Sequence, residues 1–333
     1  MNSKSFWSVF APYIRDFISL KRSLGYKYKE EERILNAFDQ FIMDQGHTSL
    51  PLTKEISDKW ADKRHNEAEL TTYNRVRVVK QLAGYLRDQG IRTYIPRLPK
   101  YPENTFIPYI YSHGEIKAIF RVCDSLRMRC RNVDSCLLIM PCLFRLLYGT
   151  GIRIGEALSL KNRDVDISRR CLTLRDTKNG KDRLIPISKS LATVFKHYLE
   201  HRNKLPVIGL ISENGPFFVS LNGEVCKQGA VHRWFQKILV LAGIPFMGNR
   251  KGPRIHDIRH TFACHSFLKL SDEGVDLYCS WPYLSTYLGH QSLESTEQYI
   301  RLTSQMYPEL LKDTDGLYVD VLPYIPAKTK EQL

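Results

Sequence analysis

The sequence predicts a mainly α protein built from a helical N-terminal bundle and an α+β domain that carries a small antiparallel sheet. Three observations predict this fold class. Apolar residues recur at helical spacing over 6–45 and 71–90. Four prolines then interrupt the chain within 95–112. Beyond them, further helical segments surround two short apolar strands that flank an Asn-Gly turn at Asn179.

Domain boundaries follow from these changes of pattern. The proline-rich stretch is poor helix and poor strand, so an extended linker is expected there. A helical, basic part precedes it, and a part with mixed helices and strands follows. We therefore expect a bundle, a linker, a second domain and a C-terminal tail over residues 1–93, 94–111, 112–313 and 314–333.

Glycines and a threonine delimit the expected N-terminal helices. The helical pattern of 6–45 breaks at Gly25 and ends at Gly46, because glycine readily adopts the backbone that closes a helix. Thr53 is placed to cap the next helix with its hydroxyl oxygen. The helix that begins near residue 71 is expected to end at Gly90.

The second domain opens with Ser112 and Glu115, which have the spacing of a capping box. A strongly apolar segment over 134–151 predicts a helix that kinks at Pro141 and stops at Gly149. Smaller elements follow: a short helix at 154–160, a hairpin of 171–175 with 183–187, helices at 189–203 and 227–243, a second small hairpin at 215–226, and helices around 281–289, 293–299 and 303–313.

Composition limits the class of protein. Lysine and arginine number 49 against 35 acidic residues, a formal net charge of +14 that suggests a polyanionic partner such as nucleic acid. The chain has neither an apolar run of about 18 residues nor a signal-peptide pattern, so we expect a cytoplasmic protein and no membrane contact. None of its eight cysteines forms a C-x-x-C pair, which favours reduced, buried thiols over zinc ligands.

One stretch concentrates the basic charge. Residues 71–100 carry seven lysine and arginine residues and one acid, Asp88. Such a segment is either a solvated helix face followed by a basic linker or a stripe that lies along phosphates. The length of the bias fits both interpretations.

Several polar residues are candidates for a chemical role, although each has an ordinary structural explanation when taken alone. Arg153 follows Gly151 at a helix start, where it is suited either to bind an anion or to pair with Glu156. His256 and Arg259 lie three residues apart and therefore on one face of a helix.

The remaining candidates lie in a turn and near the C-terminal end. The hairpin tip "DTKNGKDR" holds Lys178, Lys181 and Arg183, and the residues alone do not choose among these three cations. His290 follows a glycine, a common arrangement at helix ends, and Tyr299 lies nine residues further on.

Together, two arginines, two histidines, a lysine and a tyrosine form the set needed for phosphoryl transfer without a metal. Arginines pair with phosphate oxygens and stabilise the charge that builds on a pentacoordinate phosphorus. A tyrosine oxygen can attack phosphorus while a histidine takes its proton and a lysine protonates the leaving hydroxyl. No carboxylate cluster of the kind that binds two magnesium ions stands out, so we expect no metal and no cofactor.

Residues 149–299 resemble the catalytic domain of the tyrosine recombinases, the family that includes phage integrases and Cre-type enzymes. The matching stretches are "LLYGTGIRIGEALSLKNRDVD", "TKNGKDRLIPI", "HDIRHTFACH" and "LGHQSLESTEQYI". Their order and spacing match the family. The N-terminal helical segment resembles the family's DNA-binding core-binding domain in length, helicity and charge.

The resemblance implies a role for each candidate. Arg153 and Arg259 would clamp the phosphate, and Lys178 would be the general acid toward the leaving 5′-hydroxyl. Glu156 matches the acidic residue that the family places three positions after its first arginine, and it would support Arg153.

The same resemblance assigns the proton transfers and the nucleophile. His256 would assist proton transfer at the tyrosine, and His290 would hydrogen-bond the scissile phosphate. Tyr299 would form a 3′-phosphotyrosyl bond. Three other tyrosines nearby fit the motif worse: Tyr283, Tyr287 and Tyr307. The stretch of about 30 residues between Arg259 and His290 departs from the commonest family pattern in its tryptophan-containing part.

The implied activity is site-specific DNA recombination of the integrase or transposase kind. Its implied partners are double-stranded DNA with specific recombination sites, further copies of the chain in a homotetramer on that DNA, and accessory DNA-bending or directionality proteins. Two alternatives remain open: a type IB topoisomerase-like enzyme that religates the same strand, and a DNA-binding relative without catalysis. The tail over 314–333 either docks on a neighbouring subunit or is disordered.

Overall fold

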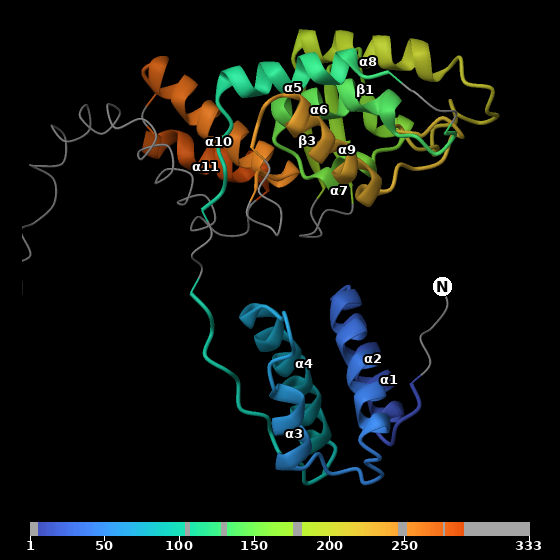
Figure 1. Ribbon diagram of the computed structural model, residues 1–333, viewed down its shortest axis with the longest axis vertical. Helices are drawn as coiled ribbons and strands as arrows, with labels where there is room; N and C mark the ends of the chain where they lie inside the picture. Colours follow the sequence, from blue (N-terminus) through green and yellow to red (C-terminus); the bar gives the residue numbers. More distant parts are fainter. Residues whose placement is uncertain are drawn as a thin grey trace, which may run out of the picture. The chain divides into compact units, whose positions relative to one another are not determined.

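The chain divides into two compact units, Met1–Phe106 and Ile107–Leu333. A computed structural model describes residues 6–103, 107–127, 132–175, 182–245, 252–275 and 277–289. Each unit has its own hydrophobic core, and Figure 1 shows the elements of both. Within the described ranges, every helix is too short or too polar to cross a bilayer.

The N-terminal unit is a bundle of helices whose apolar faces meet in one core. Phe17, Phe38 and Trp60 lie at its centre and are almost completely buried. The helices are α1 (Ala11–Ser23), α2 (Lys29–Asp44), α3 (Lys54–Ala61) and α4 (Glu69–Asp88) (Figure 1).

The predicted glycine ends and the predicted cap are confirmed, although α1 begins at Ala11 and not at residue 6. Gly25, Gly46 and Gly90 follow the ends of α1, α2 and α4, each with the positive φ that glycine adopts without strain. Thr53 caps α3, because its Oγ1 accepts a hydrogen bond from the backbone N–H of Ile56 at 3.3 Å.

Arg75, one of the seven basic residues of 71–100, is part of the interior of this unit. Its side chain is 4% exposed. Its Nε and Nη2 donate to the Glu67 carboxylate at 3.1 and 2.9 Å, and its guanidinium lies over the ring of Trp60. Arg75 therefore stabilises the bundle and does not belong to any phosphate-binding stripe.

The C-terminal unit combines helices with a small sheet, as the sequence predicts. Its helices are α5 (His113–Ser125), the 3-10 turn η1 (Leu137–Ile139), α6 (Met140–Thr150), α7 (Ile154–Leu158), the 3-10 turn η2 (Asn162–Asp164), α8 (Lys189–Arg202), α9 (Gln228–Leu241), α10 (Ile255–Asp272) and α11 (Leu277–Leu288) (Figure 1). Helix α10 packs against α6 on one side and α11 on another. The predicted capping box of Ser112 and Glu115 opens α5.

The sheet has the antiparallel order β1-β2-β3. Its strands are β1 (Val165–Asp166), β2 (Cys171–Leu174) and β3 (Arg183–Pro186). Leu172 pairs with Ile185, and both are fully buried, so one face of the hairpin belongs to the core. The hairpin of β2 and β3 was predicted, whereas β1 was not; the Asn-Gly turn lies outside the described residues.

The predicted kink at Pro141 is wrong. Pro141 lies in the first turn of α6, after the 3-10 turn η1, where its missing N–H leaves no hydrogen bond unmade. The helix ends at Thr150, one residue beyond the predicted stop at Gly149, and Gly151 closes it with a left-handed backbone.

Two other expectations change in detail. The second hairpin is reduced to a single antiparallel bridge between Val219 and Val225. The helix expected around 281–289 begins earlier, at Leu277, and carries Pro282 inside it. The helices predicted at 293–299 and 303–313 lie outside the described residues, as does the tail.

Candidate active site

Arg153 stands at the start of α7, and the carboxylate of Glu156 holds it there. Glu156 accepts the backbone N–H of Arg153 at 2.9 Å and its Nη1 at 2.9 Å. The first bond satisfies an N–H at the helix start, which has no partner within the helix. Glu156 is 8% exposed and the Arg153 side chain 24%, so the arginine reaches the surface from a buried support. The Arg–Glu pairing considered in the sequence is confirmed.

Glu156 also binds a second arginine. Arg183, the first residue of β3, donates from Nη2 to Glu156 Oε2 at 2.9 Å, and its side chain is only 14% exposed. Burial opposes ionisation of Glu156, but the hydrogen bonds from Arg153 and the charges of both arginines outweigh it and lower the pKa of this carboxyl. One carboxylate between two guanidinium groups leaves an excess of one positive charge.

The start of α10 is fixed in the same way, which sets the positions of the residues further along it. Asp257 is 1% exposed and accepts the backbone N–H of Arg254 at 2.8 Å and its Nη2 at 2.9 Å. From the other side, the Tyr111 hydroxyl donates to the Arg254 carbonyl at 3.1 Å. His256 projects from this first turn, and Arg259 follows in the next turn of the helix.

His256 and Arg259 differ in burial although they lie three residues apart. His256 is exposed, whereas Arg259 is 3% exposed. Positions i and i+3 are offset by about 60° around a helix, which lets one side chain lie at the rim while the other turns inward. The sequence spacing predicted the shared side of α10 but not this difference.

The buried guanidinium of Arg259 joins the ends of two other helices. Its Nη1 donates to the carbonyl of Gly151 at 2.8 Å, and its Nη2 donates to the carbonyl of Leu288 at 2.7 Å. Gly151 lies two residues before Arg153, and Leu288 two residues before His290. Arg259 thus fixes the backbone two residues before Arg153 and two residues before His290. Both of these acceptors are neutral backbone carbonyls.

Gly151 allows α6 and α10 to approach this closely. Its φ of 61° is a conformation that side-chain-bearing residues rarely adopt. A Cβ at this position would also overlap the ring of Phe262 on α10. The carbonyl that Arg259 binds therefore belongs to a position that only glycine can occupy without strain.

Three predicted site residues lie outside the described residues: Lys178, His290 and Tyr299. The structure does describe residues that are close in sequence to two of them, Lys178 and His290. Arg183 is the last residue of the hairpin-tip stretch, and Gly289 precedes His290. These two meet, since a Cβ built on Gly289 would lie 2.6 Å from Nη1 of Arg183.

Two of the competing tyrosines are described. Tyr287 is half-buried, its ring stacks on Phe262, and burial raises its pKa to about 12 against the opposing charge of Arg183. A phenol this hard to deprotonate is a poor nucleophile near neutral pH. Tyr283 is 79% exposed on α11, and Tyr307 lies outside the described residues.

Sequence reasoning missed the function of Arg183 as the second partner of Glu156. It had grouped Arg183 with the lysines of the hairpin tip. The strand pattern held a usable signal, because alternation from buried Ile185 places Arg183 on the core side of β3. A basic residue on that side requires an acid partner. No comparable pattern in the sequence predicts the contact between Arg183 and Gly289.

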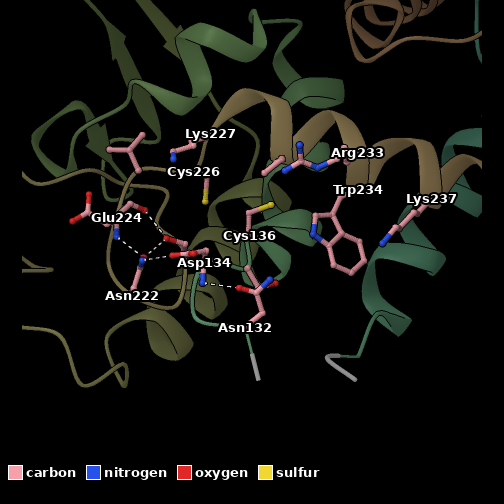
Figure 2. A pocket seen from close by; sticks show the side chains of 14 residues that line it. Asn132, Asp134, Cys136, Asn222, Glu224, Cys226, Lys227, Arg233, Trp234 and Lys237 are labelled. Atoms are coloured by element: carbon pink, nitrogen blue, oxygen red, sulfur yellow. Dashed lines mark hydrogen bonds between the residues drawn. The ribbon is translucent and has the colours of Figure 1, made fainter. Parts of the chain in front are cut away.

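A polar cavity of about 640 Å³ lies elsewhere on this unit. Figure 2 shows Arg233, Trp234 and Lys237 of α9 along it, with Asn222 and Asp134 joined by a hydrogen bond of 2.7 Å. None of the described catalytic candidates lines it. Among the residues described, no three histidine, cysteine or carboxylate side chains gather as a metal site would require.

Comparison with known proteins identifies the family. The phage integrase family model matches residues 111–306, more than half of the chain. The integrase/recombinase y4rB of Sinorhizobium fredii is 34% identical over 319 residues, which cover 94% of this chain and 99% of that protein. Tyrosine recombinase XerA of Pyrococcus furiosus is 27% identical over 290 residues, covering 86% of this chain and 88% of that protein.

Solved structures show the same fold. The XerH recombinase bound to its difH substrate has a TM-score of 0.61 at 19% identity, covering 85% of this chain and 78% of that chain. The Tn1549 transposon integrase in complex with DNA has a TM-score of 0.60 at 16% identity, covering 90% of this chain and 98% of that chain. The chain therefore belongs to the phage integrase family of tyrosine recombinases, enzymes that break and rejoin DNA strands.

Proposed function

We propose that this recombinase opens a DNA strand at a specific site with the hydroxyl of Tyr299, on a phosphate held by Arg153 and Arg259. The observation that carries this assignment is the double hydrogen bond of Arg259 to the carbonyls of Gly151 and Leu288. It brings the chain before Arg153 and the chain before His290 to one buried guanidinium. Cations from separate segments then converge, as a phosphate in a pentacoordinate transition state requires.

The reaction conserves the bond energy of the DNA. The Tyr299 oxygen forms a bond to phosphorus as the bond from phosphorus to the 5′-oxygen breaks, which leaves a 3′-phosphotyrosyl ester. His256, at the exposed rim of α10, takes the phenol proton. Lys178 gives a proton to the leaving 5′-oxygen, and His290 hydrogen-bonds a phosphate oxygen. Attack by a 5′-hydroxyl of the partner duplex reverses these steps.

Strand exchange of this kind brings two duplexes together, so the proposed assembly is a homotetramer on double-stranded DNA, acting in the cytoplasm with accessory DNA-bending or directionality proteins. The helical unit would bind DNA through residues 1–93, joined by the 94–111 linker to a catalytic domain over 112–313. The net charge of +14 supports binding to the DNA backbone. The related XerH and Tn1549 structures contain DNA.

Adduct trapping tests this function. Suicide duplexes that lose the 5′-hydroxyl strand after cleavage, drawn from a library of candidate sites, should accumulate a covalent protein–DNA species with the wild-type chain. Tyr299→Phe should form none, whereas Tyr283→Phe and Tyr287→Phe should still form it. An adduct with Tyr299→Phe would refute the nucleophile assignment, and its position would be found by peptide mapping.

The same reagents separate the two rival functions. With two differently marked duplexes, a topoisomerase-like enzyme would relax supercoils and religate each strand to itself without exchange. A DNA-binding relative without catalysis would shift the duplexes in a gel but leave no adduct on any member of the library. Joined strands carrying both marks support recombination.

A further inference from the structure

We propose that Arg183 is a positioning residue of the recombinase site, which holds Glu156 away from full pairing with Arg153 and fixes the chain at Gly289. This assignment rests on the proposed function, in which Arg153 binds the scissile phosphate. Arg183 itself does not touch the DNA in this proposal. It acts through Glu156 on one side and through the end of α11 on the other.

The two oxygens of Glu156 accept from different donors. Oε1 accepts Nη1 of Arg153, while Oε2 accepts the Arg153 backbone N–H and Nη2 of Arg183, each at 2.9 Å. An arginine and a carboxylate left to themselves favour a fork in which both oxygens accept from one guanidinium. Arg183 occupies Oε2 and so prevents that fork.

This sharing of Glu156 determines the net charge near Arg153. A forked pair with Glu156 would neutralise Arg153 at the moment when it must attract a phosphate. Sharing the carboxylate between Arg153 and Arg183 leaves one net positive charge on the trio. Because Glu156 and Arg183 are 8% and 14% exposed, water screens their attraction only weakly, and the sharing is firm.

Arg183 also contacts the chain that leaves α11. The Arg183 guanidinium lies so close to Gly289 that a Cβ there would be 2.6 Å from Nη1 and 3.1 Å from Cζ. Gly289 has a φ of 67° and precedes His290. The side chain that sets Arg153 therefore also sets the path of the backbone on which the second histidine depends.

These contacts also separate Arg183 from the lysines of the hairpin tip. A guanidinium is a poor proton donor because it stays charged at all ordinary pH values. Arg183 is thus suited to hold other groups in place, which leaves the proton transfer to the leaving group to a lysine.

The test is the cleavage rate of Arg183 variants at saturating suicide substrate, measured beside DNA affinity. Since a displacement of about 1 Å can cost on the order of 100-fold in rate, Arg183→Gln should slow adduct formation by about 10- to 100-fold. Its Kd for the duplex should change by less than about threefold, because Arg183 does not contact the DNA. Arg183→Lys, which keeps a charge near Glu156, should recover part of the rate.

A matched control comes from the same hairpin. Arg175, the residue after β2, pairs with the 5% exposed carboxylate of Asp164 at 2.9 Å but does not touch Glu156. Arg175→Gln removes an ion pair of similar geometry and should cleave at close to the wild-type rate. Equal slowing of both variants would mean that the hairpin is merely destabilised, and would overturn the assignment.

A double-variant comparison completes the test. Because Arg183 acts in part through Glu156, the rate loss of Glu156→Gln combined with Arg183→Gln should be smaller than the product of the two single losses. Fully multiplicative losses, or a wild-type rate for Arg183→Gln, would overturn the positioning role. A wild-type chain that forms no adduct would instead overturn the proposed function. Circular dichroism checks that each variant is folded. If Arg183→Gln does not fold, the cleavage rate of Arg183→Lys is compared with that of the wild type instead.

Discussion

The Nη1 of Arg259 donates a 2.8 Å hydrogen bond to the carbonyl of Gly151, a residue 108 positions earlier in the chain. The same guanidinium binds the carbonyl of Leu288. A single side chain therefore fixes the approach to Arg153 and the approach to His290. Substitutions of Arg259 and of Gly151 therefore test this relationship from its two sides.

At one end, Arg259→Lys should nearly abolish cleavage. Lysine keeps the charge but has no planar fork to bridge two carbonyls, so the ends of α6 and α11 lose their common anchor. We expect adduct formation to fall by at least about 100-fold, with DNA affinity in a gel-shift assay changed much less. A lysine variant as fast as the wild type would show that the bridge is dispensable.

At the other end, Gly151→Ala should destabilise the C-terminal unit by about 1–3 kcal/mol, because alanine resists a φ of 61° and meets the ring of Phe262. Urea unfolding of the full chain measures this change. Gly84 in the interior of α4, where no atom lies within 4 Å of a built Cβ, provides the control. Gly84→Ala should stabilise its helix by about 0.5–1 kcal/mol; similar behaviour of both would contradict the close approach.

The general acid can be identified by changing the leaving group. A 5′-bridging phosphorothiolate releases a thiolate, which needs no proton, so it should restore cleavage to the variant that lacks the acid. We expect Lys178→Ala to be slow on normal DNA and fast on the thiolate substrate. Lys181→Ala should show no such recovery. Recovery in Lys181→Ala alone would transfer the assignment to that lysine.

The stripe of basic residues on α4 predicts a salt effect. Arg77, Lys80 and Arg87 fall within about 80° of one another around the helix, and none of them is buried. Lys80→Gln should flatten the plot of log affinity against log salt by about 0.9 if it neutralises one phosphate. An unchanged slope would favour the solvated-face interpretation of 71–100.

Arg75 on the same helix should behave differently. Removing it leaves the 9% exposed Glu67 without its ion pair, which costs about 3–5 kcal/mol for a buried pair. Arg75→Gln should therefore lower the thermal stability of the N-terminal unit. At temperatures where Arg75→Gln stays folded, its affinity for DNA should equal that of the wild type. That result would confirm that Arg75 acts on stability and not on DNA binding.

His265 on α10 makes the C-terminal unit sensitive to acid. Burial and the stacked ring of His113 lower the pKa of His265 from 6.5 to about 4, and the Tyr148 hydroxyl lies 3.0 Å from its Nδ1. Between pH 6.5 and 4 the unfolded chain binds a proton that the folded chain does not, so stability is full above pH 6.5 and falls as pH drops toward 4.

Replacing the imidazole should remove that contribution. The difference in melting temperature between His265→Gln and the wild type should therefore change between pH 7 and pH 4.5, with the wild type losing more. His197→Gln, at an exposed site on α8, should retain the wild-type dependence. Parallel curves for His265→Gln and the wild type would exclude this histidine as the source.

Local signals in the sequence predicted much of the fold. Capping at Thr53 and Ser112, helix ends at glycines and the hairpin of β2 and β3 all follow from interactions within a few residues. Pro141 shows the limit of such signals. The same residue suits a kink or a first turn, and only the position of the neighbouring 3-10 turn decides between them.

The sequence predicted the Arg153–Glu156 pair that the structure shows, but it did not predict how the segments around that pair are arranged. The motif spacing selected Arg153 and Arg259, and Glu156 was correctly paired with the first. The burial of Arg259 and the contact of Arg183 with Gly289 depend on how α6, α10, α11 and β3 pack. No pattern along the chain encodes distances between segments so far apart.

The bridge formed by Arg259 has a consequence during synthesis of the chain. Its two acceptors are separated from it by 108 and 29 residues, and one of them emerges only after the arginine itself. Contacts over such separations require loop closure, which costs chain entropy and slows folding. A growing polypeptide that has not yet reached Leu288 therefore lacks one of the two carbonyls that hold this guanidinium.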